Sequence, residues 1–171
     1  MSSQFTSVYD ALITEKSGRC LFYQKFHTES VDDDPDNVER TMMSGLYQAL
    51  EVLASSLSDS FDEIQLKGMR IFFLSGSLVN CYVRVSRESK LNKLEIESIF
   101  QNVIRRFESK YYKLLVAGEG ELELFDTFSD VISQDITREI LKNGVKSSEI
   151  LKNYLGIEIK KKDARKILKN L

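Results

Sequence analysis

Few side chains in this sequence are of the types that carry out catalysis, and none has a recognisable catalytic spacing. His27 is the only histidine. Thr28 and Glu29 follow it, but neighbouring residues on a strand point to opposite faces, so this run does not assemble a triad. An exposed histidine at the end of a strand is therefore favoured over a general base.

Paired carboxylates offer the one enzymatic alternative. Asp126 and Asp130 would share one face of a helix. In an enzyme they could act as acid and base, but that role needs a pocket that perturbs them, and nothing in the sequence indicates one. We therefore predict no catalytic residue, with an enzyme of unknown type kept as the weaker alternative.

Phosphate and metal motifs are also absent from the sequence. There is no GxxxxGK[ST] loop and no GxGxxG after a strand. The acidic run Asp32–Asp34 lacks the central glycine and the terminal glutamate of an EF-hand loop, so an acidic helix start is favoured. Cys20 and Cys81 lie in apolar runs without CxxC spacing, which indicates buried free thiols. We expect no metal and no cofactor.

Charge is distributed unevenly along the chain. The net charge is −2, but the segment from Lys142 to Leu171 carries nine basic and three acidic residues, so the rest of the chain is acidic. The acidic body argues against nucleic-acid binding. The basic end is expected either to be a solvated terminal helix or to contact an anionic membrane or an acidic partner. The residues that would make this contact are Lys160, Lys161, Lys162, Arg165, Lys166 and Lys169.

Length and composition indicate one globular domain. The chain has 171 residues, of which 42% are hydrophobic and 29% charged. The segment from Met1 to Ser7 is polar, and no apolar run approaches the ~20 residues that span a bilayer. We expect a cytoplasmic protein, peripheral to a membrane if its basic end binds one.

Five segments have the pattern of strands. The first two should form a hairpin whose five-residue loop contains Gly18, placed for a positive φ angle. In the fifth segment, apolar and polar residues alternate, with Val79 and Cys81 on one face and Asn80 on the other. This alternation predicts a strand with one buried face. The predicted strands are Val8–Thr14, Cys20–Phe26, Ile64–Lys67, Arg70–Leu74 and Val79–Val85.

Helical spacing follows the second strand and the fifth. A helix of about six turns should begin near Pro35 and place an apolar stripe on the core: Val38, Met42, Leu46, Ala49, Leu50, Leu53 and Leu57. A second helix should start at an Asn92–Glu95 capping box and end before Gly118. A third is predicted from Leu122 to Lys142, with weaker helical segments at 148–155 and 163–171.

This order of elements resembles the longin fold over residues 5 to about 142. The stretch from Phe72 to Phe128 is similar in layout to adaptor small subunits: a strand ending at Arg84–Val85, a polar turn, and the long helix Leu94–Leu115. Sedlin-type TRAPP subunits and other trafficking longins share this layout. The related Roadblock fold normally begins with a helix, for which Met1–Ser7 is too short, and this favours a longin.

The resemblance implies an α/β (α+β) fold: a five-stranded antiparallel sheet with helices on both faces, longin/profilin-like, in a domain at 1–144. A basic helical extension would follow at 145–171. It also implies a non-enzymatic protein-interaction module of vesicle trafficking or small-GTPase regulation. Expected partners are other longin or Roadblock domains, a small GTPase, coat or tether subunits, or a second copy in a homodimer. Longins have no residue motif from which site residues can be transferred.

Partner contacts are instead predicted from exposed positions. Met43 and Tyr47 lie beside the apolar stripe of the first helix, where they would flank a partner groove. The alternative is that both widen the buried stripe. Arg105 and Arg106 lie opposite the apolar stripe of the second helix, as a contact patch or as ordinary solvated charge.

Overall fold

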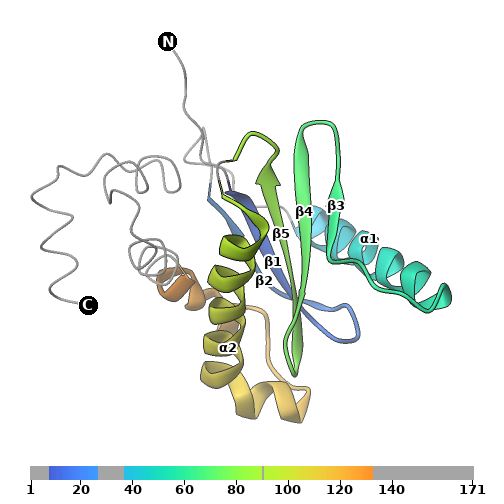
Figure 1. Cartoon of the computed structure of the whole chain (residues 1–171). Helices are drawn as coiled ribbons and strands as arrows, with labels where there is room; N and C mark the ends of the chain where they lie inside the picture. Colours follow the sequence, from blue (N-terminus) through green and yellow to red (C-terminus); the bar gives the residue numbers. More distant parts are fainter. Residues whose placement is uncertain (1–7, 27–36, 90, 133–171) are drawn as a thin grey trace, which may run out of the picture.

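The computed structural model describes residues 8–26, 37–89 and 91–132. A five-stranded antiparallel sheet with strand order β2-β1-β5-β4-β3 forms its centre. Helix α1 covers one face of the sheet, and α2 and α3 cover the other (Figure 1). The predicted fold class is therefore confirmed. The elements are β1 (Val8–Glu15), β2 (Cys20–Lys25), α1 (Asn37–Ser56), β3 (Glu63–Gln65), β4 (Met69–Ser75), β5 (Val79–Ser86), α2 (Lys93–Ala117) and α3 (Glu123–Asp126).

The strands β1 and β2 form the predicted hairpin. Gly18 has a φ of 94° in the connecting turn, a conformation that glycine adopts without strain. The turn is fixed to α1, since Ser44 Oγ donates a hydrogen bond to the Gly18 carbonyl and Gln48 Nε2 donates one to that of Ser17. The hairpin is thus positioned by the helix that follows it.

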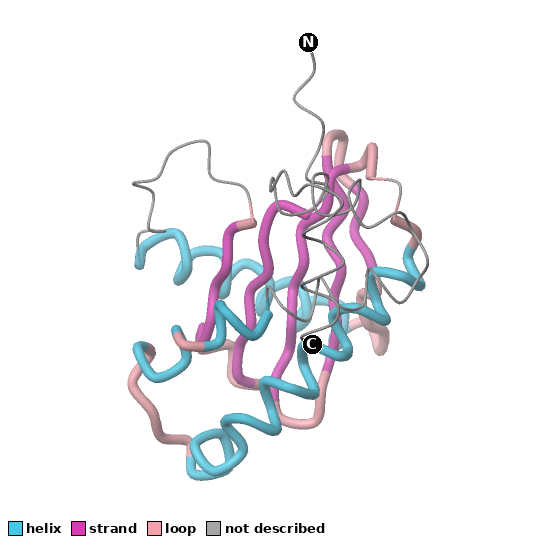
Figure 2. Tube along the Cα trace, turned by 90° about the vertical axis from the view of Figure 1, so that its left-hand side faces the viewer, coloured by secondary structure: helices cyan, strands magenta, loops and turns pink. Residues whose placement is uncertain are grey.

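The prediction of a single buried face for the fifth strand was wrong. The strand β5 lies between β1 and β4, and both of its faces are covered by helices (Figure 2). Cys81 and Val83 are fully buried under α2, while Tyr82 and Asn80 are buried on the α1 side. The prediction failed because it assumed that the polar residues of the strand face solvent, whereas Asn80 and Tyr82 lie beneath α1.

The core under α2 and α3 is built from aliphatic side chains and phenylalanines. Phe107 of α2 packs edge-on against Phe128, with ring centroids 4.9 Å apart, and stacks on Phe125 at 5.6 Å. Phe22 of β2 meets Phe128 in a T-shaped pair at 5.5 Å. Such pairs stabilise a core beyond simple area burial, and they join both helices to the sheet.

The core under α1 is smaller and more polar. Tyr47 of α1 stacks on Tyr82 of β5, with ring centroids 4.6 Å apart, and meets Phe73 edge-on at 5.9 Å. Leu12 and Ile71 complete its buried apolar part together with Tyr23. Tyrosines contribute both ring contacts and hydroxyl groups that need hydrogen-bond partners.

The orientation of α1 differs from its prediction. Met42, Leu46, Leu53 and Leu57, which were expected in the core, are 69%, 57%, 53% and 73% exposed. The buried side carries Ser44, Tyr47 and Ala54 instead. The reason is the sheet face beneath it, whose tyrosines and polar groups are matched by hydroxyl and aromatic side chains of the helix.

The start and end of α2 are as predicted. The Asn92 side chain accepts a hydrogen bond from the Glu95 amide, and the Glu95 carboxylate accepts one from the Asn92 amide, each at 2.9 Å. Gly118 ends the helix in the left-handed conformation. The residues of α2 that are buried are Ile96, Ile99, Phe100, Val103, Ile104, Phe107 and Tyr111.

The third predicted helix is interrupted. The helix α3 ends at Asp126 and a turn at Thr127 separates it from the helical residues 128–132. The rest of that prediction, the segments 148–155 and 163–171, His27 and Asp32–Asp34 lie outside the described residues. Within the described part of the chain, no helix is long and apolar enough to cross a membrane.

The close approach of α2 to the β4–β5 turn gives a stability prediction. A methyl group at Gly76 would overlap Ile104 Cγ2 and Glu108 Oε1, whose carboxylate accepts hydrogen bonds from the Leu78 and Val79 amides. We expect Gly76→Ala to lower the free energy of unfolding by about 1–3 kcal/mol in urea titrations. Gly68→Ala is the matched control, because its added methyl meets nothing within 4 Å. An equal effect at both glycines would contradict the overlap.

Candidate interaction surface

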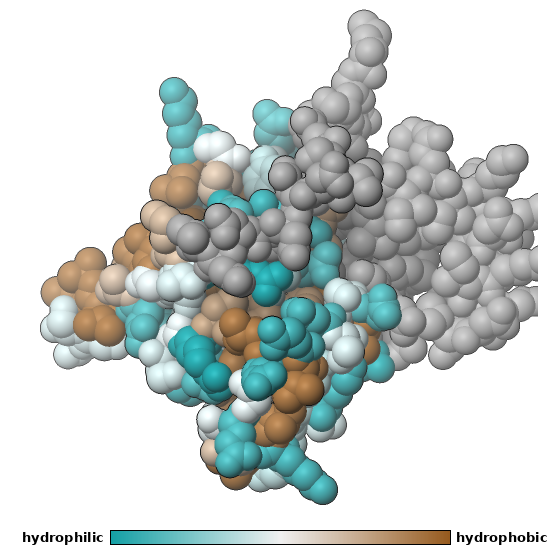
Figure 3. All heavy atoms as spheres, turned by 180° about the vertical axis from the view of Figure 1, so that it is seen from behind, coloured by the Kyte–Doolittle hydropathy of each residue, from teal (hydrophilic) through white to brown (hydrophobic). Residues whose placement is uncertain are grey.

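The outward side of α1 is apolar from Met42 onward. We call four of its residues and Leu57, which directly follows the helix, the outer face of α1; each side chain is more than half exposed, and the four are Met42, Leu46, Val52 and Leu53. In Figure 3 apolar side chains gather at the left-hand end of the molecule, over the C-terminal part of this helix. Contiguous exposed apolar patches of this kind mark interaction sites, whereas single exposed apolar residues do not.

This outer face is also free of charge. Between Thr41 and Ser58 the only charged residue is Glu51. Its carboxylate points inward, where it accepts hydrogen bonds from the Tyr82 hydroxyl at 2.7 Å and from Asn80 Nδ2 at 3.3 Å. From Met42 to Ser56 the helix therefore lacks the outward charges that a surface helix normally carries. The outer face therefore has the character of an interface.

The structure places Met43 and Tyr47 on the opposite side of α1. Tyr47 is 2% exposed, and burial raises the pKa of its hydroxyl to about 12. Met43 packs half-buried at the margin of the same core. Both residues therefore face the core, as the alternative to a partner groove expected, but they belong to the buried side themselves and do not widen the predicted stripe, which is exposed. The sequence did contain a signal for the outer face: Glu51 is the only charged residue between Thr41 and Ser58.

The two arginines predicted as a contact patch lie on the other layer of the molecule. Arg105 is exposed on α2, and its Nη2 donates to Asn102 Oδ1 at 3.3 Å. Arg106 is half-exposed beside it. Since α1 and α2 cover opposite faces of the sheet, these arginines do not join the outer face of α1. A role for them in partner binding stays a prediction, and the basic residues from Lys160 to Lys169 lie outside the described residues.

The carboxylate pair of the enzyme alternative is solvent-exposed. Asp126 lies 4.0 Å from the Arg40 guanidinium, and Asp130 is exposed further along the chain. Within residues 8–26, 37–89 and 91–132, no group of three or more His, Cys, Asp and Glu side chains is arranged to hold a metal ion. The geometry adds no support to acid–base chemistry at this pair.

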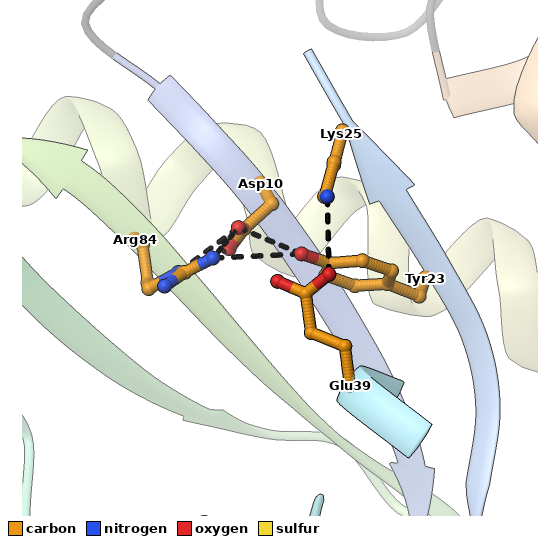
Figure 4. Close-up of polar contacts among 5 residues, drawn as sticks. All are labelled: Asp10, Tyr23, Lys25, Glu39 and Arg84. Atoms are coloured by element: carbon orange, nitrogen blue, oxygen red, sulfur yellow. Dashed lines mark hydrogen bonds and ion pairs between the residues drawn. The ribbon is translucent and has the colours of Figure 1, made fainter. Parts of the chain in front are cut away.

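A buried ion pair closes the α1-side core at the end near β2. Arg84 Nε donates to both carboxylate oxygens of Asp10, at 2.8 and 2.9 Å, and the Tyr23 hydroxyl donates to Asp10 Oδ2 at 3.0 Å (Figure 4). Lys25 and Glu39 form a second pair at 3.0 Å that links β2 to α1. Asp10 is only 2% exposed, so its charge depends on these partners.

The titration of this cluster follows from its contacts. The hydrogen bonds that Arg84 donates to Asp10 raise the pKa of its guanidinium, and burial together with the adjacent Asp10 charge raises the pKa of the Tyr23 hydroxyl. The guanidinium and the hydroxyl therefore each keep one protonation state near neutral pH. The cluster holds three strands in register.

The two cysteines lie on opposite faces of the sheet. Cys81 is fully buried in the α2-side core, and Cys20 is half-buried at the α1-side core. Burial raises the pKa of the Cys20 thiol to about 11, against a smaller lowering by Arg40. Both thiols are free, as predicted, and β1 separates the strands that carry them.

Comparisons with known proteins add a likeness of fold. No protein-family model matches the sequence, and no curated protein does. Among solved structures, MglB of Myxococcus xanthus is similar at 16% identity and a TM-score of 0.42, covering 60% of this chain and 85% of that one. A Roadblock/LC7 domain from Streptomyces avermitilis has 16% identity and a TM-score of 0.38, over 48% of this chain and 68% of its own.

The gliding protein MglB of Thermus thermophilus is similar at 18% identity and a TM-score of 0.38, covering 54% of this chain and 72% of that one. None of these three is an adaptor small subunit or a sedlin-type subunit. That finer resemblance stays a prediction. Likenesses of this strength concern the arrangement of strands and helices and identify no function.

Removing one partner of the buried ion pair should be costly. We expect Arg84→Met to lower the free energy of unfolding by about 3 kcal/mol, because it leaves the Asp10 carboxylate buried without its main partner. The double variant Asp10→Leu/Arg84→Met should lose less than the sum of the two single variants. Urea unfolding of all four proteins measures this coupling, and additive losses would contradict it.

Thiol reactivity tests the positions of the two cysteines. With a pKa of about 11, Cys20 has about one thiolate in a thousand at pH 8, so it should react slowly with Ellman's reagent and faster as pH rises. Cys81 should react only when the protein unfolds. Cys20→Ser should therefore abolish the slow phase while leaving the phase released by urea. Rapid reaction of two thiols in the folded protein would contradict these positions.

Proposed function

We propose that this chain is a non-enzymatic protein-interaction module that associates through the outer face of α1, with a second copy as its first partner. The observation that carries the proposal is the exposed, uncharged apolar stripe from Met42 to Leu57. Burying such a stripe against another protein removes it from water and gives about 25 cal/mol for each Å² of apolar area.

Self-association is favoured by the absence of charge on this face. In a two-fold dimer the same patch meets itself, so any outward charge would lie close to its own copy. The only charged residue of the stretch, Glu51, is turned inward and is hydrogen-bonded to Tyr82. Two helices can therefore pack along the stripe, which from Met42 to Leu57 is ~22 Å long at 1.5 Å per residue.

For the finer function we retain the proposal drawn from the longin resemblance. The paired module would act in small-GTPase regulation or vesicle trafficking, and its further partners would be a small GTPase, another longin or Roadblock domain, or a coat or tether subunit. A cytoplasmic location belongs to the same proposal. A membrane tether through Lys160–Lys169 is the second candidate function, supported by the basic charge of that segment alone.

Association through α1 can be tested by charge insertion. We expect the chain to elute as a dimer in size-exclusion chromatography with light scattering, and Leu53→Asp to convert it to a monomer of unchanged circular dichroism. Leu53 is 53% exposed, so the aspartate is tolerated in the monomer but not in an apolar interface.

Leu94→Asp is the matched control, because Leu94 is 75% exposed at the start of α2, away from the outer face. It should leave the mass unchanged. A wild-type monomer, or a dimer that Leu53→Asp does not weaken, would contradict the proposal. Adding candidate small GTPases from the same cell to the wild-type sample tests the finer function, and a stable complex would support it.

A further inference from the structure

The sheet has an incomplete edge beside β4. The strand β3 pairs only with Arg70–Phe72 of β4. Just before β3 begins, one further backbone hydrogen bond joins the two segments, from the Phe73 amide to the Asp62 carbonyl at 2.9 Å. Backbone groups of alternate residues point to the same side of an antiparallel strand. The amide and carbonyl of Ser75 therefore point to the same edge as those of Phe73, where no described strand continues β3.

A cavity of about 600 Å³ occupies this position. We call it the β4 notch. It extends around the sheet edge, because its walls come from both layers: Glu51 and Ser55 of α1 on one side, Glu97 and Gln101 of α2 on the other. Its size lies in the range of sites that hold a ligand. The end of β4, Phe73–Ser75, and the loop from Asp59 to Asp62 also line it.

The walls of the notch carry an excess of negative charge. Its lining holds the carboxylates of Glu51, Asp59, Asp62 and Glu97 against one amine, that of Lys16. The Lys16 ammonium is already bound to Ser75 Oγ at 2.6 Å, the Gly76 carbonyl at 2.8 Å and Asn80 Oδ1 at 2.7 Å. Its charge is therefore directed into the protein, and burial lowers its pKa.

The acidic groups on the outer walls are only weakly engaged. Lys93, at the rim, lies 3.4 Å from Asp62 and 3.7 Å from Glu97. The Asp59 carboxylate accepts a hydrogen bond from the neighbouring Ser60 amide at 2.8 Å. Exposed ion pairs of this kind contribute little free energy. A cationic side chain from a partner can therefore take the place of Lys93 beside these carboxylates.

We propose that the β4 notch binds an extended, lysine- or arginine-bearing segment of a partner protein, which adds to the sheet as a short strand beside Ser75. A free strand edge supplies backbone hydrogen bonds to such a segment, and the pockets beside it select side chains. The carboxylates of both helices select basic residues and exclude acidic ones. This site differs from the outer face of α1, because the α1 residues that line it are Glu51 and Ser55, and no residue of the outer face does.

The probe for this proposal is a short fluorescent peptide of alternating threonine and lysine, titrated with the full chain and followed by anisotropy. We expect saturable binding that weakens with added salt, since screening acts on the charge contribution. A charge-reversed peptide of alternating threonine and glutamate should not bind. A lysine peptide with N-methylated backbone amides should bind at least tenfold more weakly, because it cannot pair with the edge.

The variant that tests the walls is Asp59→Asn/Glu97→Gln, which should weaken binding of the lysine peptide by about five- to tenfold. Glu119→Gln/Glu121→Gln removes the same number of carboxylate charges, from the segment between α2 and α3, and should leave binding unchanged. Equal loss in both double variants, or equal binding of the N-methylated peptide, would overturn the proposal in favour of non-specific charge attraction. Absence of binding would overturn it outright.

The failure of this inference can be told apart from that of the proposed function. Leu53→Asp lies on the outer face and outside the lining of the notch. It should alter the molecular mass and leave peptide affinity as it is. If this variant lost both dimerisation and peptide binding, the proposal of two separate sites would be contradicted.

Discussion

The polar and aromatic character of the sheet face under α1 determines what the rest of this molecule presents to solvent. That face carries the buried Asp10–Arg84 pair and the rings of Tyr23 and Tyr82. A helix lying on it must bring hydrogen-bond partners and a ring that stacks, and Tyr47 and its neighbours supply them. Because a helix has one inward side, satisfying this face turns the aliphatic side of α1 outward.

The opposite sheet face imposes no such demand, and this explains which predictions succeeded. Val83 and Phe72 face α2 with apolar side chains, so the apolar stripe of α2 and its buried residues coincide. The Asn92 capping box and Gly118 are local signals, and they gave both ends of the helix correctly. For α1 the same counting of apolar residues selected the wrong side, because the residues that this helix buries, Ser44, Tyr47 and Ala54, are less hydrophobic than the leucines and the methionine it exposes.

The β4 notch could not be foreseen from the sequence for a different reason. Its lining joins Lys16, Glu51 and Glu97, which belong to the first hairpin, α1 and α2. Strand patterns indicated β3 and β4 but not how far they pair, and the notch exists only because β3 ends its pairing before β4 does. The number of residues that β3 pairs with β4 depends on where the chain coming from α1 reaches the edge of the sheet. No local pattern in the sequence encodes that point.

Both proposed surfaces depend on the placement of one helix. Leu53 is on the outward side of α1 while Glu51, two residues earlier, faces the notch and accepts the Tyr82 hydrogen bond. A partner packed against the outward side would contact the same helix that lines the notch, so the two binding events could influence each other through α1. Any preference that results must be reciprocal: a segment that binds the notch better in the dimer also stabilises the dimer by the same free energy. Such coupling would let this chain respond to one partner by changing its affinity for another.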